Sequence, residues 1–211
     1  MTHTFKGNFV WDMPDLHGDS TTMKALGYAL NDWQLSGVWT GATGTAYTVG
    51  TSYQSGGNVN VTGSPDYGGR MRILGDIGTG CSSDPLRQFV AAGFAPPQVN
   101  SNGLESGADY LRGCFQSALD MSLARNIRVH GNKSLQFRLD VFNLPNQAIV
   151  TGRNTTLNVT SPTDPTPLNL PYDPVTGNTV VARSLPKNVG FGGATTYQNP
   201  RTMQLQIRFS F

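Results

Sequence analysis

Charged residues are scarce in this sequence, at 13% of 211 residues, about half of the usual share of about 25%. Glutamate occurs once, at Glu105, and there are only four lysines. Because these residue types fill the exposed faces of helices, their scarcity disfavours a helical fold. Apolar residues also make up only 37% of the chain. Low charge combined with low hydrophobicity is typical of transmembrane β-barrels, in which polar lumen residues and lipid-facing residues average out.

Long apolar runs and a visible leader are missing as well. No stretch approaches the roughly 18 apolar residues that indicate a membrane-spanning helix. Residues 1–5 have neither the basic start nor the apolar core of a signal peptide, so we expect that Met1 is not the natural start and that an export signal lies upstream. The net charge of +2 is too small to indicate a nucleic-acid partner, and none is expected.

Groupings of residues that would support catalysis or cofactor binding are also missing. The serine, histidine and aspartate residues form no nucleophile motif. The three histidines have no metal-ligand spacing; they are His3, His17 and His130. One proline-rich loop carries oxygen groups of the kind that bind Ca²⁺, namely Asp164, Tyr172 and Asp173, although a solvated loop is the simpler interpretation. We therefore predict a protein that is not an enzyme and holds no cofactor or metal.

The last nine residues carry the strongest positive signal. Apolar and polar side chains alternate from residue 203 to residue 211, which predicts a strand with one apolar and one polar face. Such a strand suits a boundary between hydrocarbon and water. A terminal aromatic residue on such a strand is the signal by which the assembly machinery recognises outer-membrane barrels. The candidate signal residues are Gln204, Ile207, Phe209 and Phe211.

Four further segments alternate in the same way, so five strands are predicted. Each is near the roughly 9–11 residues that a tilted strand needs to cross a bilayer. The predicted strands are residues 5–13, 33–41, 115–129, 135–143 and 203–211. The fold class that follows is all-β, an antiparallel meander that forms an open segment of a transmembrane β-barrel.

The connections between these strands alternate between short and long. Residues 130–132 form a tight turn, and the link 14–32 is moderate, with a short helix expected at 23–30. The links 42–112 and 145–200 are long and rich in Gly, Pro, Asn, Thr and Ser, which suit irregular loops. Short turns at one end and long loops at the other are how outer-membrane barrels are built. A small hairpin inside the first long link is predicted from residues 47–49 and 59–61.

The polar faces of the predicted strands carry charged residues that point to the predicted lumen. Neighbouring strands can pair such charges across a sheet. The four residues are Asp120, Arg138, Asp140 and Arg208. They form either a structural ladder that stiffens the wall, which we favour, or a group of side chains that touch a passing substrate.

Arg125 and three tryptophans stand out on the apolar faces. Arg125 either lays its stem along the apolar band with its head at the interface, or marks a register slip or bulge. Trp11, Trp33 and Trp39 are predicted to be girdle residues at the membrane–water boundary. Exposed Trp and Tyr together with Asn also suit a site that binds sugars.

The chain has two cysteines, Cys81 and Cys114. An even number in a chain that looks exported makes a disulfide possible, and the alternative is two unrelated thiols. Both cysteines fall at the same end of the strands in the predicted layout.

Several motifs, in order along the chain, resemble the C-terminal portion of TonB-dependent outer-membrane receptors. The resemblance is greatest to the Oar-like type with a carboxypeptidase-regulatory-like N-terminal domain. Residues 11–14 resemble its aromatic-acidic-Leu-Pro strand end, and residues 33–37 with 44–49 resemble its Trp-x-Leu-Ser-Gly and Ser-Gly-x-Pro-Phe-Thr-Val pair. Residues 135–147 resemble its Leu-Gln-x-Arg-x-Glu-x-Phe-Asn-Leu-Phe-Asn signature. The closing Phe-Gly and Pro-Arg-x-x-Gln-x-x-x-Arg-Phe-x-Phe motifs are matched at residues 188–192 and 200–211.

This resemblance implies a wall segment of an outer-membrane transporter that takes up a bulky nutrient such as a glycan, a siderophore or a peptide. Family members are 22-stranded barrels with an N-terminal plug, and the inner-membrane TonB complex drives them. Residues 1–211 would then be the C-terminal segment of the barrel, without the plug and most of the barrel. The expected partners are the lipid bilayer, the barrel assembly machinery, the rest of the barrel and plug, and TonB through the missing N-terminal part.

The family layout also places the C-terminus in the periplasm and the two long loops, with both cysteines, outside the cell. The sequence departs from the family pattern at four positions. Ala46 stands in place of Pro, Asp140 in place of Glu and Pro145 in place of an aromatic residue. Gln206 occupies a position where the general assembly signal favours Gly. These departures weaken the expectation that this end is recognised well.

A secreted β-sandwich for adhesion or carbohydrate binding is the alternative that composition leaves open. Four Asn-x-Ser/Thr triplets would fit a glycoprotein; they begin at Asn60, Asn132, Asn154 and Asn158. A sandwich buries its apolar strand faces between two sheets, whereas a barrel wall leaves them to lipid.

Overall fold

The computed structural model describes residues 3–54, 70–131 and 133–211. Contacts divide these residues into two compact units. The sheet unit consists of residues 3–42, 116–148 and 199–211, and the loop unit includes residues 43–115 and 149–198. Each unit is described by itself. Two predicted features lie outside the described residues, namely the strand at 59–61 and the triplet positions Asn60 and Asn132.

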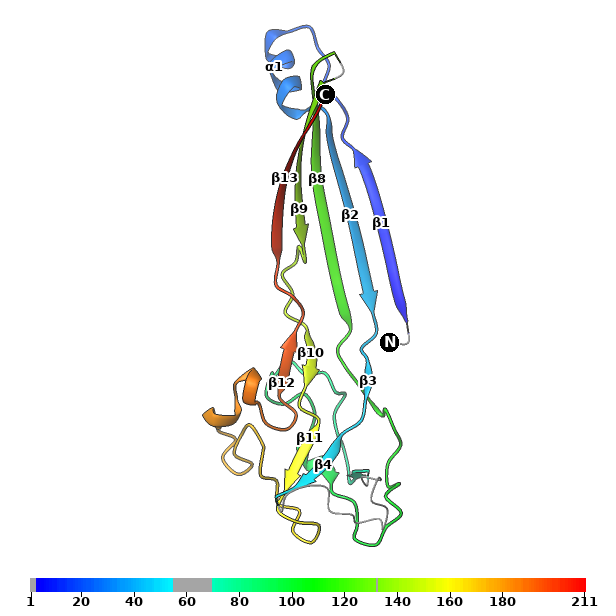
Figure 1. The fold of residues 1–211 in the computed structure, drawn as a ribbon, viewed down its shortest axis with the longest axis vertical. Coiled ribbons are helices and arrows are strands. Elements are labelled where there is room, and N and C mark those ends of the chain that lie inside the picture. The colour runs from blue at the N-terminus through cyan, green and yellow to red at the C-terminus, as the bar shows by residue number, and fades with distance from the viewer. Residues whose placement is uncertain (1–2, 55–69, 132) are drawn as a thin grey trace. The chain divides into compact units, whose positions relative to one another are not determined.

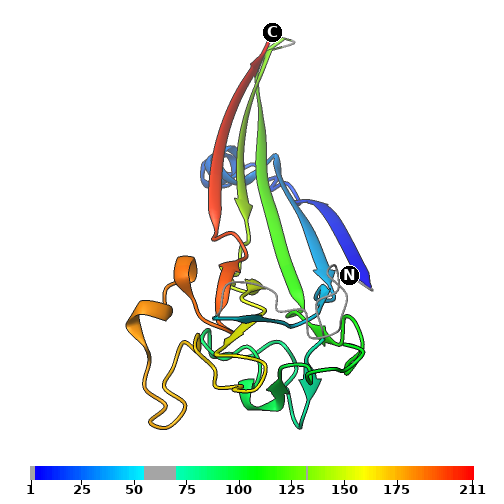
Figure 2. The same cartoon turned by 60° about the horizontal axis from the view of Figure 1, so that its bottom comes forward.

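The sheet unit contains one antiparallel sheet, which confirms the predicted meander. Figures 1 and 2 show its five strands side by side in a single layer. Their order is β1-β2-β8-β9-β13, and every neighbouring pair is antiparallel. The strands are β1 (Thr4–Asp12), β2 (Trp33–Ala42), β8 (Gln116–His130), β9 (Lys133–Phe142) and β13 (Thr202–Ser210). All five predicted segments therefore form strands, with bounds that shift by at most two residues.

The register brings the apolar positions of all five strands onto one face. Leu35 lies opposite Leu123, Leu123 lies opposite Leu139, and Leu139 lies opposite Leu205. Trp11 extends this row on β1, opposite Leu35. A slip of one residue in any pair would move that strand's apolar set to the other face. The hydrophobic pattern and the register therefore agree across the whole sheet.

Two links, one short and one of moderate length, join strands at the end of the sheet that carries the C-terminus (Figure 1). Gly131, between β8 and β9, has a φ of 58°, a left-handed conformation that glycine adopts without a steric penalty. The link from β1 to β2 holds helix α1 (Thr21–Leu30). The helix begins two residues before the predicted start because the Ser20 side chain accepts a hydrogen bond from the Met23 N–H and caps it.

The loop unit has more structure than the predicted irregular loops. Short strands pair as β3 (Ala46–Tyr47) with β7 (Leu111–Arg112), β4 (Gly50–Tyr53) with β11 (Thr156–Val159), β5 (Arg72–Ile73) with β6 (Phe94–Ala95), and β10 (Val150–Arg153) with β12 (Ala194–Tyr197). Three 3-10 turns lie between them, at Ala91–Gly93, Val181–Arg183 and Pro186–Asn188. Tyr47 pairs with Leu111; its predicted hairpin partner at 59–61 lies outside the described residues. The two long links are thus folded together by pairing between distant segments.

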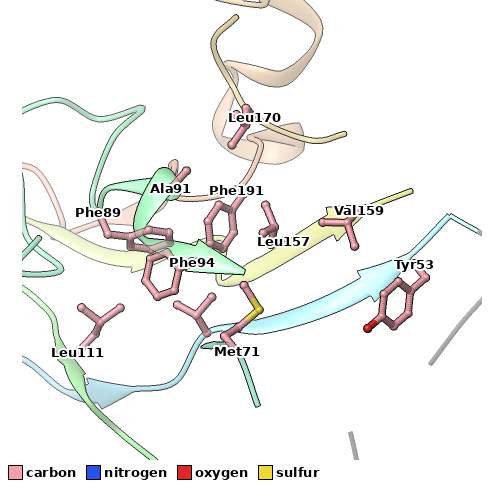
Figure 3. Packing of buried hydrophobic residues seen from close by; sticks show 11 residues of the cluster. Tyr53, Met71, Phe89, Ala91, Phe94, Leu111, Leu157, Val159, Leu170 and Phe191 are labelled. Atoms are coloured by element: carbon pink, nitrogen blue, oxygen red, sulfur yellow. The ribbon is translucent and has the colours of Figure 1, made fainter. Parts of the chain in front are cut away.

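A small hydrophobic core holds the loop unit together (Figure 3). Phe191 lies at its centre, 1% exposed, with its ring centroid 4.8 Å from that of Phe89 and 5.8 Å from that of Phe94. Both contacts are edge-on, the geometry that aromatic pairs prefer. Met71 and Leu157 are also fully buried in this cluster. The core draws residues from β4, β6, β7 and β11 and from the segments between the strands.

Tyr47 gives the loop unit an expected dependence on alkaline pH. Burial raises the pKa of this phenol to about 12, and the nearby Arg153 offsets only part of the effect. In the unfolded chain the pKa is about 10, so the unfolded state loses its proton first. The stability that this group contributes is therefore fully present below pH 10 and is lost as the pH rises toward 12.

Urea unfolding followed by near-ultraviolet circular dichroism, at several values between pH 9 and pH 12, measures this loss. Tyr47→Phe should reduce the decline without abolishing it, because burial also raises the pKa of Tyr53, Tyr110 and Tyr172. An identical pH profile for the wild type and Tyr47→Phe would refute the assignment to Tyr47.

Candidate functional site

The apolar face of the sheet is uncovered. We use "apolar face" for the side that carries Trp11, Leu35, Leu123, Leu139 and Leu205, and "polar face" for the opposite side. Leu205 is 69% exposed in the middle of β13, and Ile207 is 61% exposed. A contiguous apolar patch is rare on the surface of a soluble protein and marks an interaction surface. Among the described residues no second sheet packs over this face.

The three tryptophans lie on this apolar face at two levels. Trp11 and Trp33 belong to the end of the sheet near α1, whereas Trp39 lies six residues further along β2. At about 3.3 Å per residue this is a separation of roughly 20 Å along the strand, close to the roughly 25 Å height of the apolar band of a membrane barrel. The Trp39 indole N–H donates to the Ser117 hydroxyl at 3.0 Å. These positions suit two aromatic girdles, with Trp11 and Trp33 at one membrane–water boundary and Trp39 at the other.

The polar face carries an open groove of about 440 Å³. Its lining includes Ser36, Asp120, Ser122, Arg138 and Asp140. Apolar residues line it as well, among them Val10, Val38 and Phe142, which the period-two pattern assigned to a polar surface. The groove is therefore mixed in character.

The structure brings together two of the four predicted lumen charges. Arg138 Nε lies 2.9 Å from Asp140 Oδ1, and the Arg138 side chain is 47% exposed. Asp120 instead accepts a hydrogen bond from the Asn143 backbone N–H at 2.8 Å. Arg208 lies opposite Gln136, in a different row from Asp140. An exposed pair of this kind contributes about 0–1 kcal/mol.

Asn143 is a structural residue of this face that the sequence analysis did not single out. It is 5% exposed and its side-chain amide donates to the Gln147 and Asn199 carbonyls at 3.1 and 2.8 Å. Asn146 Oδ1 in turn accepts the Arg201 N–H at 3.0 Å. The two asparagines tie the end of β9 to the start of β13. In the sequence, the Phe-Asn-Leu-Pro-Asn segment at residues 142–146 could have indicated this structural role.

Arg125 caps helix α1, so neither proposed register slip nor bulge occurs there. It lies opposite Trp33 and Phe137 in an uninterrupted ladder, and the irregularity of β8 lies further on, between Arg128 and His130. The guanidinium donates to the Asn31 carbonyl at 3.1 Å and to the Tyr28 carbonyl. A cation near the C-terminus of a helix satisfies free carbonyls and complements the helix dipole.

Replacing Arg125 by Gln should therefore loosen α1. We expect a loss of about 1–2 kcal/mol, the range for a partly buried cation at a helix C-terminus. Hydrogen exchange of the amides in α1 should speed up by about 5- to 30-fold. Arg128→Gln, three residues along the same strand, is the matched control and should leave that exchange unchanged. Equal exchange rates in the two variants would exclude the capping role.

The C-terminal candidate residues lie on the last strand and just beyond it. Gln204, Ile207 and Phe209 belong to β13, and Phe211 follows it with 93% of its surface exposed. The Phe209 and Phe211 rings stack with centroids 6.1 Å apart. The far edge of β13 has no partner strand among the described residues. Recognition of this end by assembly machinery stays a prediction.

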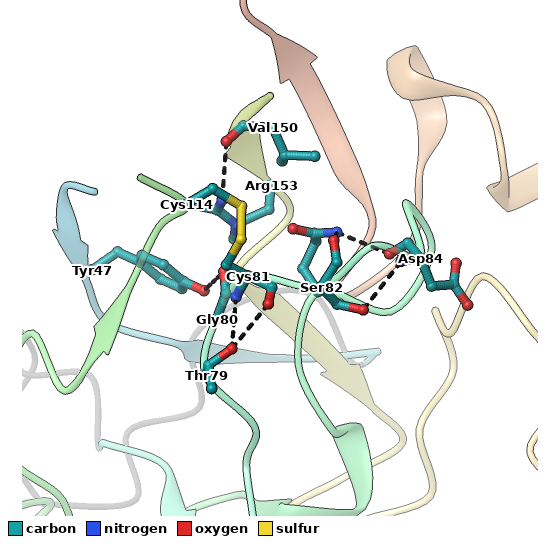
Figure 4. The surroundings of a disulfide bond; sticks show 10 residues. Tyr47, Thr79, Gly80, Cys81, Ser82, Asp84, Cys114, Val150 and Arg153 are labelled. Atoms are coloured by element: carbon teal, nitrogen blue, oxygen red, sulfur yellow. Dashed lines mark hydrogen bonds between the residues drawn. A yellow bond between two sulfur atoms is a disulfide. The ribbon is translucent and has the colours of Figure 1, made fainter. Parts of the chain in front are cut away.

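A disulfide joins Cys81 and Cys114 in the loop unit, with a Cα–Cα distance of 4.9 Å (Figure 4). Hydrogen bonds hold the segment that precedes Cys81. The Thr79 hydroxyl donates to the Cys81 carbonyl at 2.9 Å, and the Tyr47 hydroxyl donates to the Gly80 carbonyl at 3.1 Å. The bond closes a segment whose ends are 33 residues apart in the sequence.

The acidic residues considered for Ca²⁺ serve as turn caps. Asp173 Oδ1 accepts the backbone N–H groups of Thr176 and Val175, each at 2.8 Å, and these bonds lower the pKa of the carboxyl. Asp164 accepts from the hydroxyl and the N–H of Thr166. In the described part of the chain no group of three or more His, Cys, Asp or Glu side chains is arranged to hold a metal ion.

Among the described residues, no helix has both the length and the apolar character that crossing a membrane requires.

Comparison with known protein families gives a match over nearly the whole chain. A family model described as an outer membrane beta barrel domain matches residues 1–204. No curated protein and no solved structure matches the chain significantly. The match covers nearly the whole chain, and it agrees with the five-stranded antiparallel sheet and its two faces. This chain therefore belongs to the outer membrane beta-barrel domain family and is located in the outer membrane.

Proposed function

We propose that this chain is a wall segment of a TonB-dependent transporter that takes up a bulky nutrient across the outer membrane. In this proposal the apolar face contacts lipid and the polar face lines the lumen. The observation that carries it is the sheet itself, with one exposed apolar face, one charged face and a register that separates the two throughout. The ordered series of receptor-like motifs gives the transporter class.

The number of strands supports a larger barrel. Five strands are too few to close a membrane barrel, which takes at least about eight, and β1 and β13 each have one free edge among the described strands. An unpaired edge within a bilayer is costly because its N–H and C=O groups find no water. We therefore infer that further strands of the same barrel pair with these edges, and that a plug and a TonB-contacting segment belong to the same protein.

A secreted β-sandwich is less well supported. It requires a second sheet that covers the apolar face, and Leu205, Ile207 and Phe209 are more than half exposed. No described feature favours a catalytic function. The loop unit, which joins β2 to β8 and β9 to β13, is the part of this chain that we expect to select the nutrient.

Uptake of labelled nutrients by whole cells tests the transport proposal. Fluorescent glycans, siderophores and peptides are each offered to wild-type cells, to cells that lack the gene, and to wild-type cells treated with a protonophore. We expect one class to enter wild-type cells only, because transport by a TonB system needs the energised inner membrane. Uptake of every class without the gene would contradict the proposal, and uptake that survives the protonophore would indicate a passive pore.

A further inference from the structure

Helix α1 presents an apolar face that nothing in the sheet unit covers. Leu26 and Leu30 are four residues apart and so share one side of the helix; they are 42% and 51% exposed. Lys24 and Tyr28 share a different side, and Tyr28 is 84% exposed. The two leucines and Lys24 thus lie on opposite sides of the helix, the arrangement that lets a helix lie in a membrane interface with its apolar side toward the acyl chains.

The contacts of α1 are with side chains of the apolar face at one end of the sheet. The Trp33 indole N–H donates to the Ala29 carbonyl at 3.0 Å, and Arg125 donates to the Tyr28 and Asn31 carbonyls. By the strand register both Trp33 and Arg125 belong to the apolar face, since they lie opposite each other in the row that continues to Phe137. Figure 1 shows the helix at the end of the sheet that carries the C-terminus.

The loop before the helix fixes this position. The Asn31 side chain exchanges hydrogen bonds with the Leu16 backbone, at 2.8 Å to its N–H and 3.1 Å to its carbonyl. Asp15 accepts the Asp32 N–H at 3.0 Å. Gly27 is the one buried residue of the helix, and a Cβ there would lie 3.2 Å from the Leu16 carbonyl. The C-terminal end of the helix is therefore held by the loop that precedes it.

We propose that α1 is a membrane anchor that lies in the lipid interface at the end of the sheet that carries the C-terminus. The occupant of its Leu26 and Leu30 face is the boundary between phospholipid headgroups and acyl chains. Continuity carries the argument, because the helix is bonded to the same face whose apolar side chains meet the membrane. Side chains that cap the carbonyls of residues 28, 29 and 31 suit this setting, since a free carbonyl there would find little water.

This inference rests on the proposed contact between the apolar face and lipid, and the test separates the two. A small fluorescent amino acid is placed at one position at a time in the intact protein as its cells make it. The protein is then reconstituted in vesicles of ordinary or of brominated phospholipid, and bromine quenches a probe that touches the acyl region. The positions are Leu26 and Leu30 on the helix stripe, Lys24 as the helix control, Leu205 on the apolar face and Gln206 on the polar face.

We expect quenching at Leu26 and Leu30 to be about two- to threefold greater than at Lys24, with Leu205 quenched and Gln206 not. Quenching at Leu205 with no difference between Leu26 and Lys24 would overturn the anchor and leave the wall intact. Equal quenching at Leu205 and Gln206 would overturn the lipid-facing wall, and the anchor with it. All five positions are exposed, so the probes are not expected to disturb folding.

Discussion

Replacing Leu205 by Arg is expected to lower the stability of the protein in a bilayer by about 2–4 kcal/mol. Leu205 lies in the middle of β13, on the apolar face, opposite Leu139. From the middle of the strand, the arginine side chain is too short to bring its guanidinium to water, so the charge stays in hydrocarbon. Folding of the intact protein into phospholipid vesicles at increasing urea concentration, followed by the gel shift of the folded barrel, measures the change.

Gln204→Arg is the matched control, because Gln204 is the neighbouring residue on the opposite face and lies across from Asp140. Its effect should stay below about 1 kcal/mol, as expected for a charge in a watery lumen. Leu139→Arg and Gln136→Arg provide the same comparison on β9. If Arg were tolerated equally well on both faces, the assignment of the apolar face to lipid would be wrong.

Removing the disulfide should destabilise the loop unit by about 3–4 kcal/mol. This figure follows from the loss of loop-closure entropy for a segment of this length, given that Cys81 and Cys114 are 33 residues apart. The double change of Cys81→Ser and Cys114→Ser should speed the hydrogen exchange of buried amides in the loop unit, including that of Phe191. The sheet amides of β9 and β13 serve as the internal reference and should keep their protection.

Reduction of the wild type provides an independent check. A reductant should weaken the protection of the loop unit in the wild type and have no effect on the double variant. Intact-mass analysis should show that the exported protein gains two hydrogens only when it is reduced. Two free thiols before reduction would show that the disulfide does not form in the exported protein.

Much of the sheet was predictable from the sequence, because its information is local. Each strand carries its own alternation, and the segment at residues 203–211 shows the pattern without interruption. Once the faces are known, antiparallel neighbours must match apolar with apolar, so the row from Leu35 to Leu205 follows. The alternation did not predict the exposed apolar side chains on the polar face, such as Val38. A period of two describes the strand as a whole and does not identify single residues that depart from it.

The loop unit was not predictable in this way. Phe191 meets Phe89 and Phe94 in its core, yet it lies about a hundred residues further along the chain, and no short repeat indicates this contact. The role of Arg125 was hidden for a similar reason. Its partners are the carbonyls of Tyr28 and Asn31, nearly a hundred residues earlier, and only the fold brings them within reach.

The most direct test of the central claim is site-resolved photo-cross-linking along β13 in living cells. A photoreactive amino acid is placed in turn at each position from residue 203 to residue 209. Positions 203, 205, 207 and 209 should form adducts with phospholipid, whereas 204, 206 and 208 should not, because odd and even side chains point to opposite faces of the strand. Lipid adducts without this alternation, or adducts of the odd positions with protein alone, would contradict the account.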